Sequence, residues 1–163
     1  MIKEFLTRAG DFIRKIIDYS YPPFRKFVPQ QIFHYGISGG INLVFDWVLY
    51  FLIFNFVLRK QMLDLVFVTL SSHVAAFALK FPITLLSGFF LQKYVTFSYS
   101  IDTKGRVQLL RYFGIVIVNV VIYYFGLKFF VESVGLFPSI ANVIMSIFTS
   151  IVGYAGQKFF TFK

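Results

Sequence analysis

The 163-residue chain has no cysteine and little charge. Without cysteine it can hold no disulfide framework, no thiolate metal site and no cysteine nucleophile. Only 14% of its residues are charged, whereas an ordinary soluble domain carries about 25%. Hydrophobic residues make up 58% of the chain, and a water-soluble fold of this length could not bury so much apolar surface. The composition therefore predicts a membrane protein.

Sequence signals of common enzyme classes are missing as well. The chain has no glycine-rich phosphate loop, no HExxH pattern and no pair of carboxylates within one apolar stretch. Phosphate-binding loops, zinc hydrolases and glycosidases need these patterns. We therefore expect neither an enzyme nor a cofactor or metal site.

Four apolar stretches are long enough to cross a bilayer. Crossing about 30 Å of hydrocarbon takes roughly 20 helical residues, and every backbone polar group must be satisfied inside the segment. The stretches that qualify are 35–58, 65–91, 112–131 and 138–157. We expect an all-α membrane protein of four transmembrane helices with almost no soluble domain.

Basic residues are distributed unevenly between the two sides of these helices. The net charge of +9 could indicate nucleic acid binding, but in a membrane protein lysine and arginine mainly report topology. One side has Arg59, Lys60 and Lys128. The other side has twelve cations: Lys3, Arg8, Arg14, Lys15, Arg25, Lys26, Lys93, Lys104, Arg106, Arg111, Lys158 and Lys163. This asymmetry predicts cytoplasmic N- and C-termini, an inner-membrane location, a retained first helix and no nucleic acid partner.

The N-terminal segment has the pattern of an amphipathic helix. Its apolar residues follow helical spacing, with basic residues between them: Ile2, Phe5, Leu6, Ala9, Phe12, Ile13, Ile16 and Ile17. Such a helix is expected to lie on the anionic cytoplasmic leaflet, although a basic topology signal without further role is an alternative. Prolines at 22, 23 and 29 end it, so residues 1–31 are interpreted as a cytoplasmic segment and linker.

The remaining chain, 32–163, contains an internal repeat. The sequence GFFLQKYVTF at 88–97 matches GYAGQKFFTF at 153–162, and Tyr35-Gly36 agrees more weakly with Phe113-Gly114. We expect two helical hairpins, about 32–100 and 110–163, that enter from the same side. Parallel repeats of this kind imply a pseudo-twofold axis along the membrane normal.

The deepest ionisable residues inside the predicted spans are Asp46, Lys80 and His73. A charge at the centre of a membrane helix costs about 2.5–3.5 kcal/mol, so each is a candidate functional group. At 1.5 Å per residue, Asp46 and Lys80 lie at roughly 16 and 18 Å from the cytoplasmic end, which predicts an ion pair. The pair either pins the hairpin or offers a cation to a phosphate. His73 is either a proton-linked switch or an interfacial ring.

The second half lacks these charges. The repeat aligns Met145 with Lys80, and Tyr123 or Tyr124 with Asp46. The predicted site is therefore asymmetric, with its charged groups in the first half.

Uncharged polar residues add two further candidates. Asn42 and Asn119 lie about 10 Å deep in the first and third helices and either line a path or join helices by hydrogen bonds.

A pair of basic boxes lies where the second and fourth helices meet the cytoplasm. They consist of Gln92 with Lys93 and Gln157 with Lys158. Snorkelling lysines in an aromatic belt explain them without a substrate. Their recurrence also suits two sites for a lipid phosphate head group.

The chain resembles the GtrA-like family of small four-helix membrane proteins over residues 32–163. The resemblance rests on FHYGISGG at 33–40, on Asn42 and Asp46, and on the closing Lys-aromatic-x-Thr-Phe boxes. The boxes depart from the family pattern, because Gln92 and Gln157 replace an asparagine and the usual tryptophan is absent.

The resemblance implies a role in cell-surface polysaccharide synthesis, in which a polyprenyl-phosphate-linked sugar is translocated between leaflets and glycosyltransferases are partners. We expect a homodimer or a transferase complex, because four helices enclose a thin groove. The implied path runs past Lys93, Lys158, Asn42, Asn119, Lys80, Asp46 and His73. Two alternatives remain: a small multidrug-type cation exporter that uses Asp46, and a non-transporting accessory subunit of a glycosyltransferase.

Overall fold

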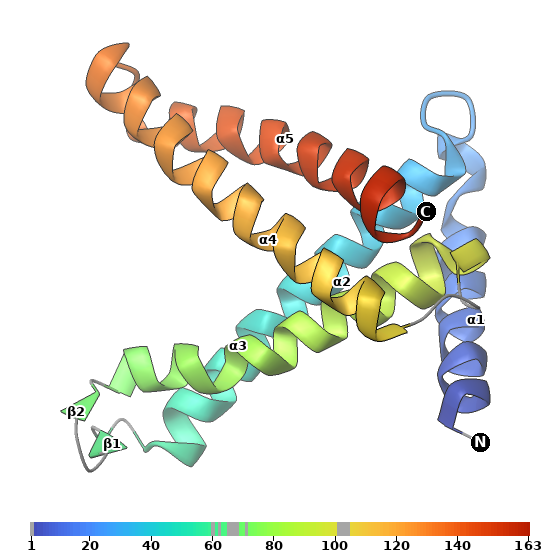
Figure 1. Ribbon diagram of the computed structural model, residues 1–163, viewed down its shortest axis with the longest axis horizontal. Helices are drawn as coiled ribbons and strands as arrows, with labels where there is room; N and C mark the ends of the chain where they lie inside the picture. The colour runs from blue at the N-terminus through green and yellow to red at the C-terminus, as the bar shows by residue number, and fades with distance from the viewer. Residues whose placement is uncertain (1, 60, 62, 65–68, 71, 101–104) are drawn as a thin grey trace. The chain divides into compact units, whose positions relative to one another are not determined.

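The computed structural model describes the chain except residues 1, 60, 62, 65–68, 71 and 101–104, and it is predominantly helical (Figure 1). The α-helices are α1 (Ile2–Ser20), α2 (Gln30–Leu52), α3 (Ser72–Leu91), α4 (Gly105–Lys128) and α5 (Pro138–Gly156). Short elements complete the fold: the 3-10 turns η1 (Pro22–Phe24) and η4 (Ser98–Ser100), and the antiparallel strands β1 (Leu63–Asp64) and β2 (Thr69–Leu70).

Each of α2 to α5 runs without a break into one turn of π-helix. These turns are η2 (Ile53–Val57), η3 (Gln92–Thr96), η5 (Phe129–Ser133) and η6 (Gln157–Thr161). Four segments are long and apolar enough to cross a membrane: Gln30–Val57, Ala75–Thr96, Gly105–Ser133 and Ile140–Thr161. The prediction of an all-α protein with four candidate spans and a preceding N-terminal helix is confirmed.

The predicted start of the second span is wrong. We expected helix from residue 65, but α3 begins at Ser72, and Thr69 and Leu70 are strand residues that pair with Asp64 and Leu63. Residues 65–68 and 71 lie outside the described part of the chain. A short apolar run suits a strand as well as a helix. Hydropathy alone therefore extended the span too far.

The surface of the spans suits a lipid solvent. Large apolar side chains such as Trp47, Val120 and Ile147 are more than half exposed, an arrangement that water would penalise. The chain is a multi-pass membrane protein.

The chain divides into two compact units, 1–98 and 99–163. In the first unit α2 and α3 form a hairpin. We call its end at Gln30 and Thr96 the proximal end and its β1–β2 end the distal end. At the distal end Ile53, Leu58, Ala75 and Ala76 form a small core. In the second unit α4 and α5 form the corresponding hairpin, whose proximal end carries η6.

Helix α1 packs across the proximal end of the first hairpin (Figure 1). Ile17 is buried there with Leu91 and Val95. Gly10 allows the closest approach, because a Cβ at this position would lie 2.5 Å from Tyr94 Cβ. The N-terminal helix is therefore part of the first compact unit.

The two repeated boxes have the same backbone. Phe97 N–H donates to the Gln92 carbonyl at 2.8 Å, and Phe162 N–H donates to the Gln157 carbonyl at 2.8 Å. Both phenylalanine side chains are fully buried. The repeat seen in the sequence is thus a repeat of local structure, in which each closing helix widens into a π turn.

Candidate functional site: a polar stripe along α2

Helix α2 carries a polar or hydroxyl-bearing side chain at every fourth position through an otherwise apolar span. The five residues are His34, Ser38, Asn42, Asp46 and Tyr50, and we call them the α2 stripe. Residues four apart are neighbours on a helix surface. The stripe extends about 24 Å at 1.5 Å per residue, from the proximal end to beyond the middle of the span.

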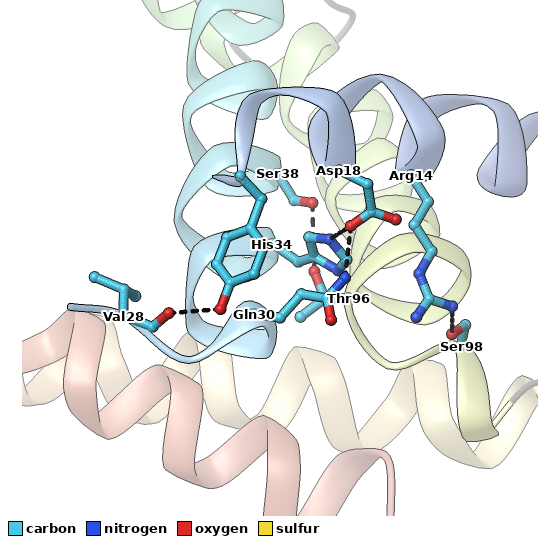
Figure 2. A network of polar contacts seen from close by, with 9 residues as sticks. Arg14, Asp18, Val28, Gln30, His34, Ser38, Thr96 and Ser98 are labelled. Atoms are coloured by element: carbon cyan, nitrogen blue, oxygen red, sulfur yellow. Dashed lines mark hydrogen bonds and ion pairs between the residues drawn. The ribbon is translucent and has the colours of Figure 1, made fainter. Parts of the chain in front are cut away.

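The proximal end of the stripe is fixed by α1. His34 Nε2 lies 2.7 Å from Asp18 Oδ1, and Gln30 Nε2 donates to the same oxygen at 2.7 Å (Figure 2). Burial alone would raise the pKa of Asp18, but the hydrogen bonds from Gln30 and His34 and the positive charge of Arg14 lower it below its ordinary value. The carboxylate thus remains charged and holds a buried imidazole in place.

One helical turn further, the stripe meets the π turn of the second helix. Thr96 Oγ1 donates to Ser38 Oγ at 3.3 Å, and Ser38 is fully buried. Beside this contact Arg14 Nη1 donates to Ser98 Oγ at 2.6 Å (Figure 2). The proximal end therefore combines groups from α1, α2 and η3 in one polar network.

The middle of the stripe is paired by α3. Ser87 Oγ donates to Asn42 Oδ1 at 2.6 Å. Asp46 accepts a hydrogen bond from Thr84 Oγ1 at 3.0 Å and forms an ion pair with the Lys80 ammonium. A ladder of hydroxyl, amide and charged groups therefore continues into the apolar part of the hairpin.

Lys80 is held by more than its carboxylate. Its Nζ lies 5.4 Å from the ring centroid of Tyr50 and 5.7 Å from that of Phe77, distances at which a cation is attracted by an aromatic face. The side chains of Lys80 and Asp46 are 13% and 20% exposed. A cation with two ring faces and one counter-ion can exchange that counter-ion for a phosphate without becoming isolated.

The depths of the two paired charges match each other, as the sequence predicted. Asp46 and Lys80 each lie about 24 Å, or 16 residues, from the proximal ends of their spans at Gln30 and Thr96. The structure therefore brings these two predicted residues together and joins Asn42 to them through the same helix face.

Two other predicted residues are placed differently. Asn119 lies in α4 of the second unit, where its Oδ1 is buried and has no hydrogen-bond partner among the residues that the structure describes. His73 falls in the first turn of α3, but its side chain lies outside what the structure describes.

The lysines of the two boxes are held in the same way. Lys93 Nζ lies 6.0 Å from the ring centroids of Phe89 and of Tyr94. The corresponding atom of the second box lies 5.6 Å from two rings at equivalent positions, those of Tyr154 and Phe159. Each ammonium is thus bracketed by the aromatic residues four before and one after it.

The glutamines of the boxes share a second feature. Gln92 Oε1 and Gln157 Oε1 are buried, and neither accepts a hydrogen bond within the described part of the chain. Leaving a buried acceptor unpaired costs about 1–3 kcal/mol. The recurrence of this cost in both halves is a reason to look for a donor supplied by a ligand.

The second unit preserves the shape of the site but not its charge. Aligning the π turns places Gly126 at the position of Tyr50, and Met145 at that of Lys80. Met145 packs directly against Gly126, so an apolar contact replaces the cation and its ring. The sequence alignment placed Tyr123 or Tyr124 at the position of Asp46. The structural alignment places Ile122 there instead.

Several partners in this network were not predicted from the sequence. Thr84 and Ser87 lie four and seven residues after Lys80, on the same face of α3. His34 and Ser38 lie eight and four residues before Asn42 on α2. The four-residue spacing was the available signal, and it is missed when only charged residues and asparagines are considered.

Comparison with known proteins agrees with this architecture. Residues 34–162 match the family model described as GtrA/DPMS, transmembrane domain. No curated protein and no solved structure matches the chain. The matched region begins at His34, the first residue of the α2 stripe, and ends in the second box at Phe162. The chain therefore belongs to the GtrA/DPMS transmembrane-domain family and is a membrane protein of glycoconjugate synthesis.

Proposed function

We propose that the protein translocates a polyprenyl-phosphate-linked sugar between the leaflets of the cytoplasmic membrane. The observation that carries this proposal is the α2 stripe, in which Asp46 pairs with a cation of α3, Lys80, deep in an apolar hairpin. Membership in a family of glycoconjugate synthesis supports the substrate class.

The chemistry of the substrate matches the stripe. A sugar phosphate cannot cross hydrocarbon unaided, because burying an ionised group without a partner is prohibitive, whereas a polyprenyl tail can remain in lipid. Lys80 offers the phosphate a counter-ion, and the carboxylate released from it, Asp46, accepts hydrogen bonds from sugar hydroxyls. Ser87 and Asn42, one to two turns closer to the proximal end, can likewise exchange their mutual hydrogen bond for hydrogen bonds to the head group.

The boxes are proposed to receive the head group before it reaches the stripe. Lys93 and Lys158 supply positive charge at the level of lipid head groups, and the unpaired amide oxygens of Gln92 and Gln157 suit donation from sugar hydroxyls. From the first box the head group would pass along the stripe to Asp46 and its α3 partner Lys80. Asn119 and His73 remain further candidates along the path.

The orientation follows from the charge of the loops. Twelve cations flank the proximal side and three the distal side, which favours a cytoplasmic proximal side and cytoplasmic termini. Because the chain has no cysteine, single cysteines at Ser20 and Gly135 can be tested with a membrane-impermeant thiol reagent in intact cells. Labelling at Gly135 alone supports this orientation, and labelling at Ser20 alone contradicts it.

The partners are proposed to be glycosyltransferases that load and unload the carrier, and a second copy of the chain. Crosslinking in native membranes tests the second copy. A dimer band supports it, and recovery of monomers only would count against it.

The cation-exporter alternative is less well supported. Such a transporter needs a carboxylate free to bind a cationic drug, but Asp46 is already paired with Lys80. The accessory-subunit alternative requires no transport at all, so the assay below separates it from the proposal.

The test is leaflet exchange of a short-chain polyprenyl-phosphate sugar in liposomes that contain the purified protein. We compare wild type, Lys80→Met and, as a matched control, Lys128→Met, because Lys128 is half exposed and lies in the second unit. We expect exchange that Lys80→Met abolishes and Lys128→Met retains. Equal exchange in all three would refute the role of Lys80, and no exchange with wild type would favour the accessory role.

A further inference from the structure

Helix α1 has two different apolar faces. Ile13 and Ile17 pack with Leu91 and Val95 at the proximal end of the first hairpin. A second set of apolar residues on α1 is more than half exposed: Phe5, Phe12, Ile16 and Tyr19. A helix that needed only to attach to the hairpin would not need this second set.

The three kinds of surface on α1 are arranged around its axis at regular angles. On a helix of 3.6 residues per turn, successive residues are about 100° apart. The exposed apolar residues share one third of the circumference, and the hairpin-facing residues, including Gly10, share the next. The remaining third carries Glu4 and Asp11, while Asp18, at its edge, contacts Gln30 and His34 of α2.

Two of the four basic residues of α1 mark the border between two of these faces. Arg8 and Lys15 lie between the acidic third and the exposed apolar third, one on each side of Asp11 in the sequence. At such a border the long stems cover apolar surface, while the charged heads reach phosphate groups. The acidic residues lie beyond this basic border, so that Arg8 and Lys15 separate them from the exposed apolar third.

We propose that the exposed apolar face of α1 inserts into the anionic phospholipid leaflet on the proximal side of the membrane. A helix at a bilayer surface beside a transmembrane hairpin meets three environments, namely protein, lipid and water, and α1 has one face for each. Its hairpin-facing residues fix it to the ends of membrane spans, so the bilayer surface is within its reach. The occupant of the exposed face is lipid, and this inference does not depend on transport.

The docked helix has a consequence for the first box. Gly10 lies against Tyr94, and Arg14 donates to Ser98 just beyond η3. Insertion of α1 therefore holds the η3 turn at the level of the lipid head groups. This gives α1 a positioning role for Gln92 and Lys93.

Three consecutive residues provide the test, because Asp11, Phe12 and Ile13 face the three environments in turn. The chain has no cysteine, so a nitroxide label on Asp11→Cys, Phe12→Cys or Ile13→Cys reports one face of the full-length protein in vesicles. Collision with molecular oxygen reports lipid, and collision with a water-soluble nickel chelate reports water.

In vesicles that contain phosphatidylglycerol, we expect the label at Phe12 to collide with oxygen more than with the chelate, and the label at Asp11 to show the reverse. The label at Ile13 should be protected from both. Replacing Arg8 and Lys15 by Gln, or using phosphatidylcholine alone, should shift the label at Phe12 toward the chelate.

Two results would overturn the proposal. If the labels at Phe12 and Asp11 met the chelate equally, the face would lie in water. If the label at Phe12 were protected from both reagents, the face would be covered by protein, such as a second copy. Size-exclusion chromatography of each variant, together with the protected label at Ile13, shows that α1 remains folded on the hairpin.

Discussion

Separating Asp46 from Lys80 should destabilise the first hairpin more than removing both charges together. Lys80→Met leaves a buried carboxylate, and the loss of one partner of a buried pair costs about 3–5 kcal/mol. Thr84 still donates to that carboxylate, so we expect the lower end, about 3 kcal/mol.

The reverse single variant, Asp46→Asn, should cost less. Lys80 keeps the ring faces of Tyr50 and Phe77, each worth about 0.5–1 kcal/mol, and the new amide can still accept hydrogen bonds. We expect a loss of about 2 kcal/mol for this variant.

The double variant contains no intramembrane charge at this depth. Replacing a buried ion pair by neutral groups of similar volume is often close to neutral, so we expect a loss of about 1 kcal/mol or less. The two substitutions should therefore be coupled by at least about 4 kcal/mol. Reversible unfolding of the four proteins in mixed micelles with increasing sodium dodecyl sulfate measures the coupling. If the double variant lost the sum of the two single losses, Asp46 and Lys80 would not act as a pair and the reasoning would be refuted.

Three further predictions concern the ends of the hairpins. Gly114→Ser should stabilise the second unit by about 1 kcal/mol in the same unfolding assay. Gly114 occupies the position of Ser38, which pairs with Thr96 in the first half, and the equivalent Thr161 Oγ1 is buried without a partner in the described structure. Unchanged or lower stability would show that the repeats are not equivalent there. Gly10→Ala should lower the free energy of unfolding by about 1–3 kcal/mol, because its Cβ would lie 2.9 Å from the Tyr94 carbonyl oxygen. Hydrogen exchange of the α1 amides should become faster. Unaltered exchange would contradict the close packing. The pKa of Asp18 is lowered in the folded protein, so its contribution is present above its unfolded value of 3.8 and is lost as pH falls through the lower folded value. Acid should therefore lower the protection of α1 amides, relative to their intrinsic exchange rates at the same pH, in wild type but not in Asp18→Asn. An equal loss of protection in both proteins would argue against this contact.

The parts of the fold that depend on hydrophobic length could be predicted from the sequence. Twenty apolar residues have few alternatives to a membrane helix, and the matched depths of Asp46 and Lys80 followed from helical rise alone. The start of α3 could not be obtained in this way, because the apolar segment before it is also a good strand former.

The hydrogen-bonded part of the site was harder to predict. Serine is common in membrane helices, so Ser38 and Ser87 did not stand out in the sequence. The hydrogen-bond partner of a serine hydroxyl can be predicted only when the crossing of the helices is known. The contact between Asp18 and His34 depends on how α1 crosses the hairpin, which neither periodicity nor charge specifies. The π turns at the ends of the spans were likewise absent from any sequence pattern.

The central claim is that the head group of a lipid-linked sugar travels along the α2 stripe. It is tested most directly by a polyprenyl-phosphate sugar that carries a photoreactive diazirine on the sugar, irradiated in liposomes with wild-type protein and mapped by mass spectrometry. The account predicts adducts on the stripe and its partners, at Asn42, Asp46 and Thr84, which an excess of unlabelled lipid removes. Adducts confined to lipid-facing residues such as Trp47 would contradict it.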